Sequence, residues 1–226
     1  MFEYENTVVI TDQFCTKEIT SYKKAIQIEP ANITQAMLDN HAEAVRVLKD
    51  DPHQCTSHSI IIIDQSASMK IGDVECFCSR SEASYGTLAL DYIAEQLYPM
   101  GDDFVGDAVS IIEMNDEGSL VVDKQPLDWI LFNNMLHRLK KARPRSHGNY
   151  VKSLKFADQI ISRELALYAD LDEEDIPWFM LSIFISDGRP SDCKPENEVS
   201  RESIVARIAY RLKSKLTVQG MGLGVA

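Results

Sequence analysis

Long hydrophobic runs are missing from this chain of 226 residues. Its apolar runs, such as Ile60 to Ile63, are far shorter than the ~20 residues that a membrane-spanning helix needs. The first residues, Met1 to Glu5, are acidic and lack the hydrophobic segment of a secretory signal. Cysteine is also scarce, with five residues scattered along the chain, so no disulfide framework is expected. These absences predict a cytoplasmic protein with reduced thiols and no membrane partner.

Basic residues are few relative to acidic ones. The chain has 23 Lys and Arg against 35 Asp and Glu, which gives a formal net charge of −12. This charge repels the phosphate backbone, so we do not expect a nucleic-acid partner. A hydrophobic content of 45% is ordinary for a soluble protein. The length allows one large domain, or one domain with an appendage.

Strand and helix patterns alternate from Ser57 to the end of the chain. The apolar segments Ser59–Ile63 and Trp178–Ile185 predict parallel strands that are buried on both faces. Turn residues separate Ala108–Met114 from Ser119–Val122, which predicts an antiparallel pair. Helices are expected near Ser84–Tyr98, Trp129–Leu139, Val151–Tyr168 and Ser200–Leu212, and a last strand from Leu216. We predict an α/β fold with a three-layer, Rossmann-like, doubly wound sheet, mostly parallel with one antiparallel edge strand.

Residues 1–56 read as a polar lead-in with one clear helix, Ile33–Lys49, and a possible strand at Thr7–Thr11. Asn32 is the expected N-cap of the helix. Its apolar residues recur at helical spacing, so we expect this face to dock on the following domain: Leu38, Ala42, Val45 and Leu48.

Polar side chains follow the two central strands. Asp64, Ser66 and Ser68 come directly after Ile63, and Asp187 comes just after Ile185. In parallel sheets, ligands bind at the carboxyl ends of the strands. Two carboxylates and two hydroxyls form an all-oxygen set that suits Mg²⁺, Mn²⁺ or Ca²⁺ rather than zinc. The alternative is that they are turn residues that cap helices.

These motifs resemble those of von Willebrand factor type A domains. The segment Asp64-x-Ser66-x-Ser68-Met69 is similar to the first loop of that family's metal-ion-dependent adhesion site. Ser186-Asp187-Gly188 resembles its aspartate–glycine loop, and Gly106–Ser110 resembles the start of its second strand. The resemblance runs from about Ser57 to Gly224.

The resemblance implies direct metal ligands at Ser66 and Ser68, with Asp64 and Asp187 binding directly or through water. The position of the family's usual threonine ligand is occupied by Asn149, whose amide oxygen is also a neutral metal ligand. It further implies that residues 57–226 are one such domain. The resemblance also predicts that this domain is truncated, because the family normally continues with another helix.

The function implied by this resemblance is a protein–protein interaction module of an intracellular protein, not an enzyme. It depends on Mg²⁺ or Mn²⁺, and an acidic side chain of the protein partner completes the metal shell. One alternative is a metal-independent scaffold in a larger assembly, such as a kinase- or ubiquitin-linked complex. A second is a phosphatase of the haloacid dehalogenase type with Asp64 as nucleophile. That chemistry needs an acid two residues on, where this chain has Ser66.

Two further clusters have ordinary interpretations beside functional ones. The basic run from Lys140 to Arg145 is either a solvated helix end or a docking site for acidic partners near the edge of the sheet where the metal is expected. His53, Cys55 and His58 lie close in sequence, but one short cluster in a linker is weak support for a zinc site.

Overall fold

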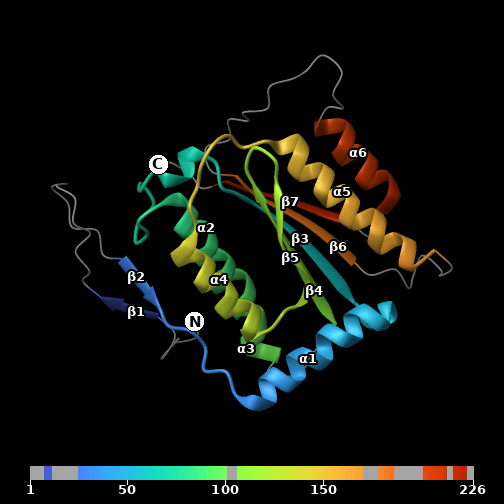
Figure 1. The fold of residues 1–226 in the computed structure, drawn as a ribbon, viewed down its shortest axis with the longest axis horizontal. Coiled ribbons are helices and arrows are strands. Elements are labelled where there is room, and N and C mark those ends of the chain that lie inside the picture. Colours follow the sequence, from blue (N-terminus) through green and yellow to red (C-terminus); the bar gives the residue numbers. More distant parts are fainter. Residues whose placement is uncertain are drawn as a thin grey trace.

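The computed structural model describes residues 8–11, 25–100, 106–169, 178–185, 201–212 and 216–222. Within these residues, the main feature is a five-stranded sheet with the order β5-β4-β3-β6-β7 (Figure 1). Its strands are β3 (Ser57–Asp64), β4 (Asp107–Met114), β5 (Ser119–Pro126), β6 (Trp178–Ile185) and β7 (Leu216–Gly222).

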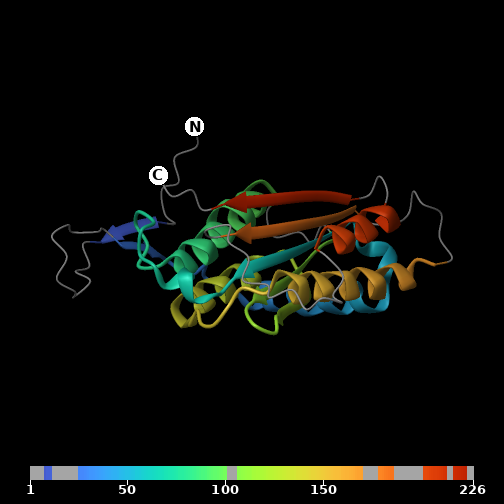
Figure 2. The same cartoon turned by 90° about the horizontal axis from the view of Figure 1, so that it is seen from above.

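Strand β3 lies at the centre of the sheet and is parallel to both neighbours, β4 and β6. Strand β7 continues the parallel pairing beyond β6, while β5 is antiparallel to β4. The predicted parallel pair and the predicted antiparallel edge strand are therefore confirmed. Ile61 is fully buried, as expected for a strand with consecutive isoleucines. Figure 2 shows β7, β6 and β3 in succession across the sheet.

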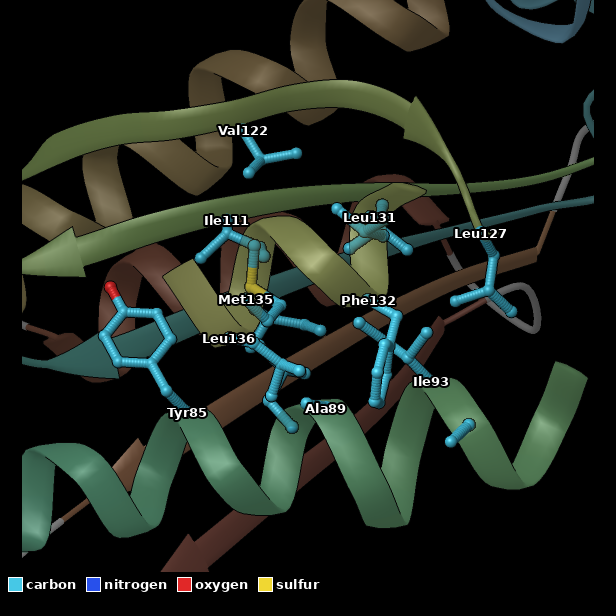
Figure 3. Close-up of a cluster of buried hydrophobic side chains, with 14 of the residues drawn as sticks. Tyr85, Ala89, Ile93, Ile111, Val122, Leu127, Leu131, Phe132, Met135 and Leu136 are labelled. Carbon is cyan, nitrogen blue, oxygen red and sulfur yellow. The ribbon is translucent and has the colours of Figure 1, made fainter. Parts of the chain in front are cut away.

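Side chains from β3 enter two separate cores because they alternate between the faces of the sheet. Ile61 and Ile63 pack with the helical segments α2, η3 and α4, whereas Ile60 and Ile62 pack with α5 and α6. Figure 3 shows the first core, where Tyr85 and Ile93 extend toward the side chains of α4. The helical segments are α2 (Arg80–Thr87), η3 (Leu88–Ala94, a π-helix), α3 (Glu95–Met100), α4 (Trp129–Lys141), α5 (Tyr150–Leu167) and α6 (Arg201–Leu212). No helix in the described ranges combines the length and the apolar character needed to cross a membrane.

The lead-in contains a small hairpin and the predicted helix. The possible strand at Thr7–Thr11 is confirmed as β1 (Val8–Thr11). It pairs antiparallel with β2 (Ala25–Ile28), a strand that the sequence did not indicate. Helix α1 (Gln35–Asp50) begins after Thr34, so the prediction of Asn32 as its N-cap is wrong. The Thr34 side chain accepts the Met37 N–H at 3.2 Å and satisfies one of the helix's first donors. Two short 3₁₀ turns, η1 (Pro52–Gln54) and η2 (Ala67–Lys70), flank β3.

Helix α1 does dock on the sheet domain, but only part of the predicted stripe makes the contact. Leu48 is 1% exposed and packs with Cys55 and Ala108, whereas Leu38 is 45% exposed. The contact side also carries His41, whose Nδ1 lies 2.5 Å from Asp128 Oδ2 at the start of α4. The predicted roles of Leu38 and Ala42, which are both exposed, are therefore wrong, because the helix meets its neighbours along the line of His41 and Leu48.

Candidate metal site at the carboxyl end of β3

Three of the predicted ligands lie together where β3 ends. Asp64 is 3% exposed, and its Oδ1 accepts the Ser66 N–H at 2.7 Å. The Ser66 and Ser68 hydroxyl oxygens lie 3.1 Å apart. The spacing of i, i+2 and i+4 brings these side chains to one place because the chain turns into η2 directly after Ser66. One carboxylate and two hydroxyls thus form a compact set of oxygen donors.

The loop that carries these donors is held from both sides. The Gln65 N–H donates to the Met114 carbonyl at the end of β4 at 2.9 Å. The Gln65 side chain accepts the hydroxyl of Ser81 in α2, also at 2.9 Å. On the other side, Arg145 N–H donates to the Gln65 carbonyl and Ala67 N–H donates to the Ser146 carbonyl. Hydrogen bonds to three other elements therefore fix the position of this loop.

The segment before α5 also reaches the site. A Cβ built on Gly148 would lie 3.5 Å from Asp64 Oδ1 and 3.5 Å from the Ser66 Cβ. The next residue, Asn149, is the N-cap of α5, and its Oδ1 accepts the Lys152 N–H at 3.2 Å. The structure thus brings the predicted Asn149 next to the loop but gives its amide oxygen a helix-capping role. As a ligand, Asn149 stays a prediction.

The fifth predicted ligand, Asp187, lies outside the described residues, and so does the aspartate–glycine loop around it. Within the described ranges, no group of three or more His, Cys, Asp or Glu side chains is placed to hold a metal. The donor set at the end of β3 is of another kind, since two of its three members are serine hydroxyls. Hard oxygen donors of this type fit Mg²⁺ or Mn²⁺.

A hydrogen-bonded network that the sequence did not indicate lies near this end of the sheet. Tyr85 OH donates to Glu113 Oε1 at 2.5 Å, and Arg138 Nη1 reaches the same oxygen at 3.2 Å. Burial and the nearby Glu113 raise the pKa of Tyr85, so its hydroxyl remains a donor. Asp116, an exposed residue, receives hydrogen bonds from the Ser146 side chain and the His147 N–H in the segment before α5, and these lower its pKa.

A second buried polar cluster lies near the other end of β3. His58 Nε2 is 2.9 Å from Ser110 Oγ, and Lys124 Nζ is 2.5 Å from Glu164 Oε2. Burial lowers the pKa of His58 to about 4 and raises the pKa of Cys55 to about 11. Sequence reading missed this cluster, since its members come from different elements. The structure places His58 inside the fold, as part of β3, so the interpretation of this residue as part of a linker is wrong.

No protein-family model and no curated protein matches this chain. Among solved structures, it is similar to an aerotolerance-related membrane protein from Bacteroides fragilis, with 15% identity and a TM-score of 0.49 over 75% of this chain and 68% of that one. A von Willebrand factor type A protein from Catenulispora acidiphila gives 13% identity and a TM-score of 0.46, over 75% of this chain and 34% of that one. Manganese-loaded TRAP protein from Plasmodium vivax gives 13% and 0.41, over 76% of this chain and 59% of that one. Scores this low do not place the chain in a family.

Proposed function

We propose that this chain is a protein–protein interaction module that depends on Mg²⁺ or Mn²⁺. Asp64, Ser66 and Ser68 would hold the cation, and Asp187 would supply a second carboxylate. The observation that carries the proposal is the joint position of a buried carboxylate and two hydroxyls 3.1 Å apart at the end of the central strand. Asn149 is the weakest member, because its oxygen already caps α5.

The chemistry of the donors supports a binding role. When bound, the cation supplies an electrophilic centre for an anionic group of a partner, because neutral hydroxyls leave most of its charge uncompensated. The protein's own residues fix the donors before binding, through the hydrogen bonds of Gln65 and Ala67. Gly148 borders these donors, because a Cβ at this position would lie 3.5 Å from Asp64 Oδ1. The partner that fits is a protein that offers an acidic side chain.

We further propose that the chain is not an enzyme and that it works inside the cell. The residue two positions after Asp64 is a serine, so a phosphoaspartate mechanism would lack its general acid. Residues 57–226 would form the binding domain, of the von Willebrand factor type A kind, with residues 1–56 as an appendage.

One observation favours a second candidate function, a metal-independent scaffold in a larger assembly. The oxygen of Asn149 that would face a metal accepts the Lys152 N–H instead. If this capping contact excludes the ligand role, the fold would act through other surfaces, for example in a kinase- or ubiquitin-linked complex.

Electron paramagnetic resonance of Mn²⁺ tests the proposal, because the signal of free aqueous Mn²⁺ falls as the ion binds protein. We expect the wild-type chain to bind one Mn²⁺ that excess Mg²⁺ displaces, and the variant Ser66→Ala/Ser68→Ala to lose this binding. Ser162→Ala is the control, since Ser162 is exposed on α5, where its hydroxyl donates to the Asp158 backbone carbonyl and accepts a hydrogen bond from Arg211. Equal binding by the double variant and the wild type would refute the site.

A phosphate-ester assay separates this proposal from the enzyme alternative. We expect no hydrolysis of p-nitrophenyl phosphate in the presence of Mg²⁺. Turnover that Asp64→Asn abolishes would show that Asp64 acts as a nucleophile and would overturn the non-enzymatic assignment.

A further inference from the structure

Four exposed cations follow one another at the end of α4 and the start of the next loop. We name them the basic segment: Lys140, Lys141, Arg143 and Arg145. Among the described residues, none of them forms an ion pair, although the chain as a whole has a net charge of −12. Every other arginine whose side chain the structure describes is paired with a carboxylate: Arg46, Arg80, Arg138, Arg163, Arg207 and Arg211.

The end of a helix explains only part of this segment. Lys140 and Lys141 lie in the last turn of α4, where cations interact favourably with the helix dipole. Arg143 Nη1 donates to the Ala142 carbonyl at 2.8 Å. Arg145 lies beyond the C-cap, Ala142, and its side chain is exposed. Neither the dipole nor the capping contacts account for a cation at that position.

The basic segment ends against the candidate metal site. The Arg145 N–H donates to the Gln65 carbonyl at 2.9 Å, and the next residue, Ser146, accepts the Ala67 N–H at 3.0 Å. These two contacts lie on either side of Ser66. Exposed positive charge is therefore anchored directly beside the Asp64 loop, in a protein whose overall charge repels anions.

We propose that the basic segment is a docking surface for an acidic peptide segment of a partner protein. The choice of a docking surface beside the metal site rests on the proposed function, in which one carboxylate of the partner reaches the metal. The attraction between the cations and the peptide itself needs no metal. Complementary charge of this kind raises the rate of encounter and fixes the orientation of a partner. The basic segment contains no aromatic residue on which the bases of a nucleic acid would stack, which favours a peptide as the partner.

Fluorescence anisotropy with a labelled peptide of alternating Glu and Gly tests the proposal. The variant Arg143→Gln/Arg145→Gln should bind this probe roughly two- to 25-fold more weakly, since each exposed ion pair contributes a factor of about 1.4 to 5. The matched control is Arg46→Gln/Lys49→Gln, which removes the same charge from exposed positions of α1. The control should bind like the wild type, and added salt should weaken wild-type binding.

The same titrations in Mg²⁺ and in chelator separate the two proposals. If the peptide binds equally well in Mg²⁺ and in chelator but more weakly to Arg143→Gln/Arg145→Gln, the docking surface is supported and the metal-dependent function is refuted. If binding needs Mg²⁺ but both double variants match the wild type, the metal function stands and the docking surface is refuted. Equal losses in the two double variants would show a non-specific charge effect and also refute it. Tighter binding of a single-stranded oligonucleotide than of the peptide would refute the choice of partner.

Discussion

Leu48 anchors helix α1 to the sheet domain, and Leu38 on the same helix provides a matched control. The Leu48 side chain is 1% exposed and packs with Cys55 and Ala108, while Leu38 is 45% exposed. Both Leu→Ala substitutions remove the same atoms from the same helix, and leucine and alanine have similar helix propensities. A difference between the two variants therefore measures the docking contact.

The expected magnitude follows from burial. A fully buried Leu→Ala change costs about 2–5 kcal/mol, and the lower half of that range applies to Leu48 because its small cluster can partly collapse. Leu38→Ala should change the free energy of unfolding by less than about 0.5 kcal/mol. A loss of 2–3 kcal/mol corresponds to a melting temperature lower by roughly 4–12 °C in a domain of this size.

Urea denaturation followed by far-UV circular dichroism measures both variants. A single transition in which Leu48→Ala has a lower midpoint, with Leu38→Ala near the wild type, would confirm that α1 is part of the folded unit. Equal midpoints for the two variants would refute the reasoning, since α1 would then be an independent tail.

Three other substitutions give sharp expectations. Glu164→Gln leaves Lys124, which is 11% exposed, without its charged partner. It should lower the free energy of unfolding in urea by roughly 3 kcal/mol, and a loss under about 1 kcal/mol would contradict a tight pair. Burial lowers the pKa of His58 from 6.5 to about 4, so stability should be full above pH 6.5 and fall by up to about 3 kcal/mol as the pH drops to 4. In His58→Gln, the loss of stability between pH 6.5 and 4 should disappear. The same pH dependence in the variant and the wild type would show that His58 does not cause this loss. Asn149→Thr should tighten Mg²⁺ binding in calorimetry while changing stability by only a few tenths of a kcal/mol, because both residues cap helices; unchanged affinity would exclude a ligand role for Asn149.

The strands were the most predictable part of the fold. Continuous apolar segments such as Ile60–Ile63 favour strands that are buried on both faces. The turn residues before Ser119 predicted that the next strand pairs antiparallel with β4. The start of α1 was less predictable. Asn32 and Thr34 are both good N-caps, and the hydrogen bond from Met37 N–H to Thr34 decides between them.

Tertiary packing decided the features that the sequence could not. The buried pair of Lys124 and Glu164 joins β5 to α5, and no local pattern marks two charged residues as buried partners. The face of α1 was misjudged for a similar reason. Helical spacing identifies an apolar stripe, but only the positions of the neighbouring elements decide that Leu48 is covered and Leu38 is not.

The candidate site was predictable where its donors are close in sequence. Asp64, Ser66 and Ser68 follow one strand, so their spacing alone indicated a cluster of oxygens. The segment before α5 reaches the same loop through Gly148, as the resemblance implied. Spacing could not show that the Asn149 oxygen would be occupied by the Lys152 N–H, because that contact depends on where α5 begins.

Isothermal titration calorimetry of Mg²⁺ into the wild-type chain and into Asp64→Asn tests the central claim most directly. Asn at position 64 keeps the side-chain shape and an oxygen that can accept the Ser66 N–H, but removes the charge. The account predicts saturable binding to the wild type, no binding to Asp64→Asn, and a stabilisation of about 2.7 kcal/mol at a hundredfold excess of Mg²⁺ over its dissociation constant. Identical heats for the two proteins, with no change in wild-type melting temperature between chelator and Mg²⁺, would contradict it.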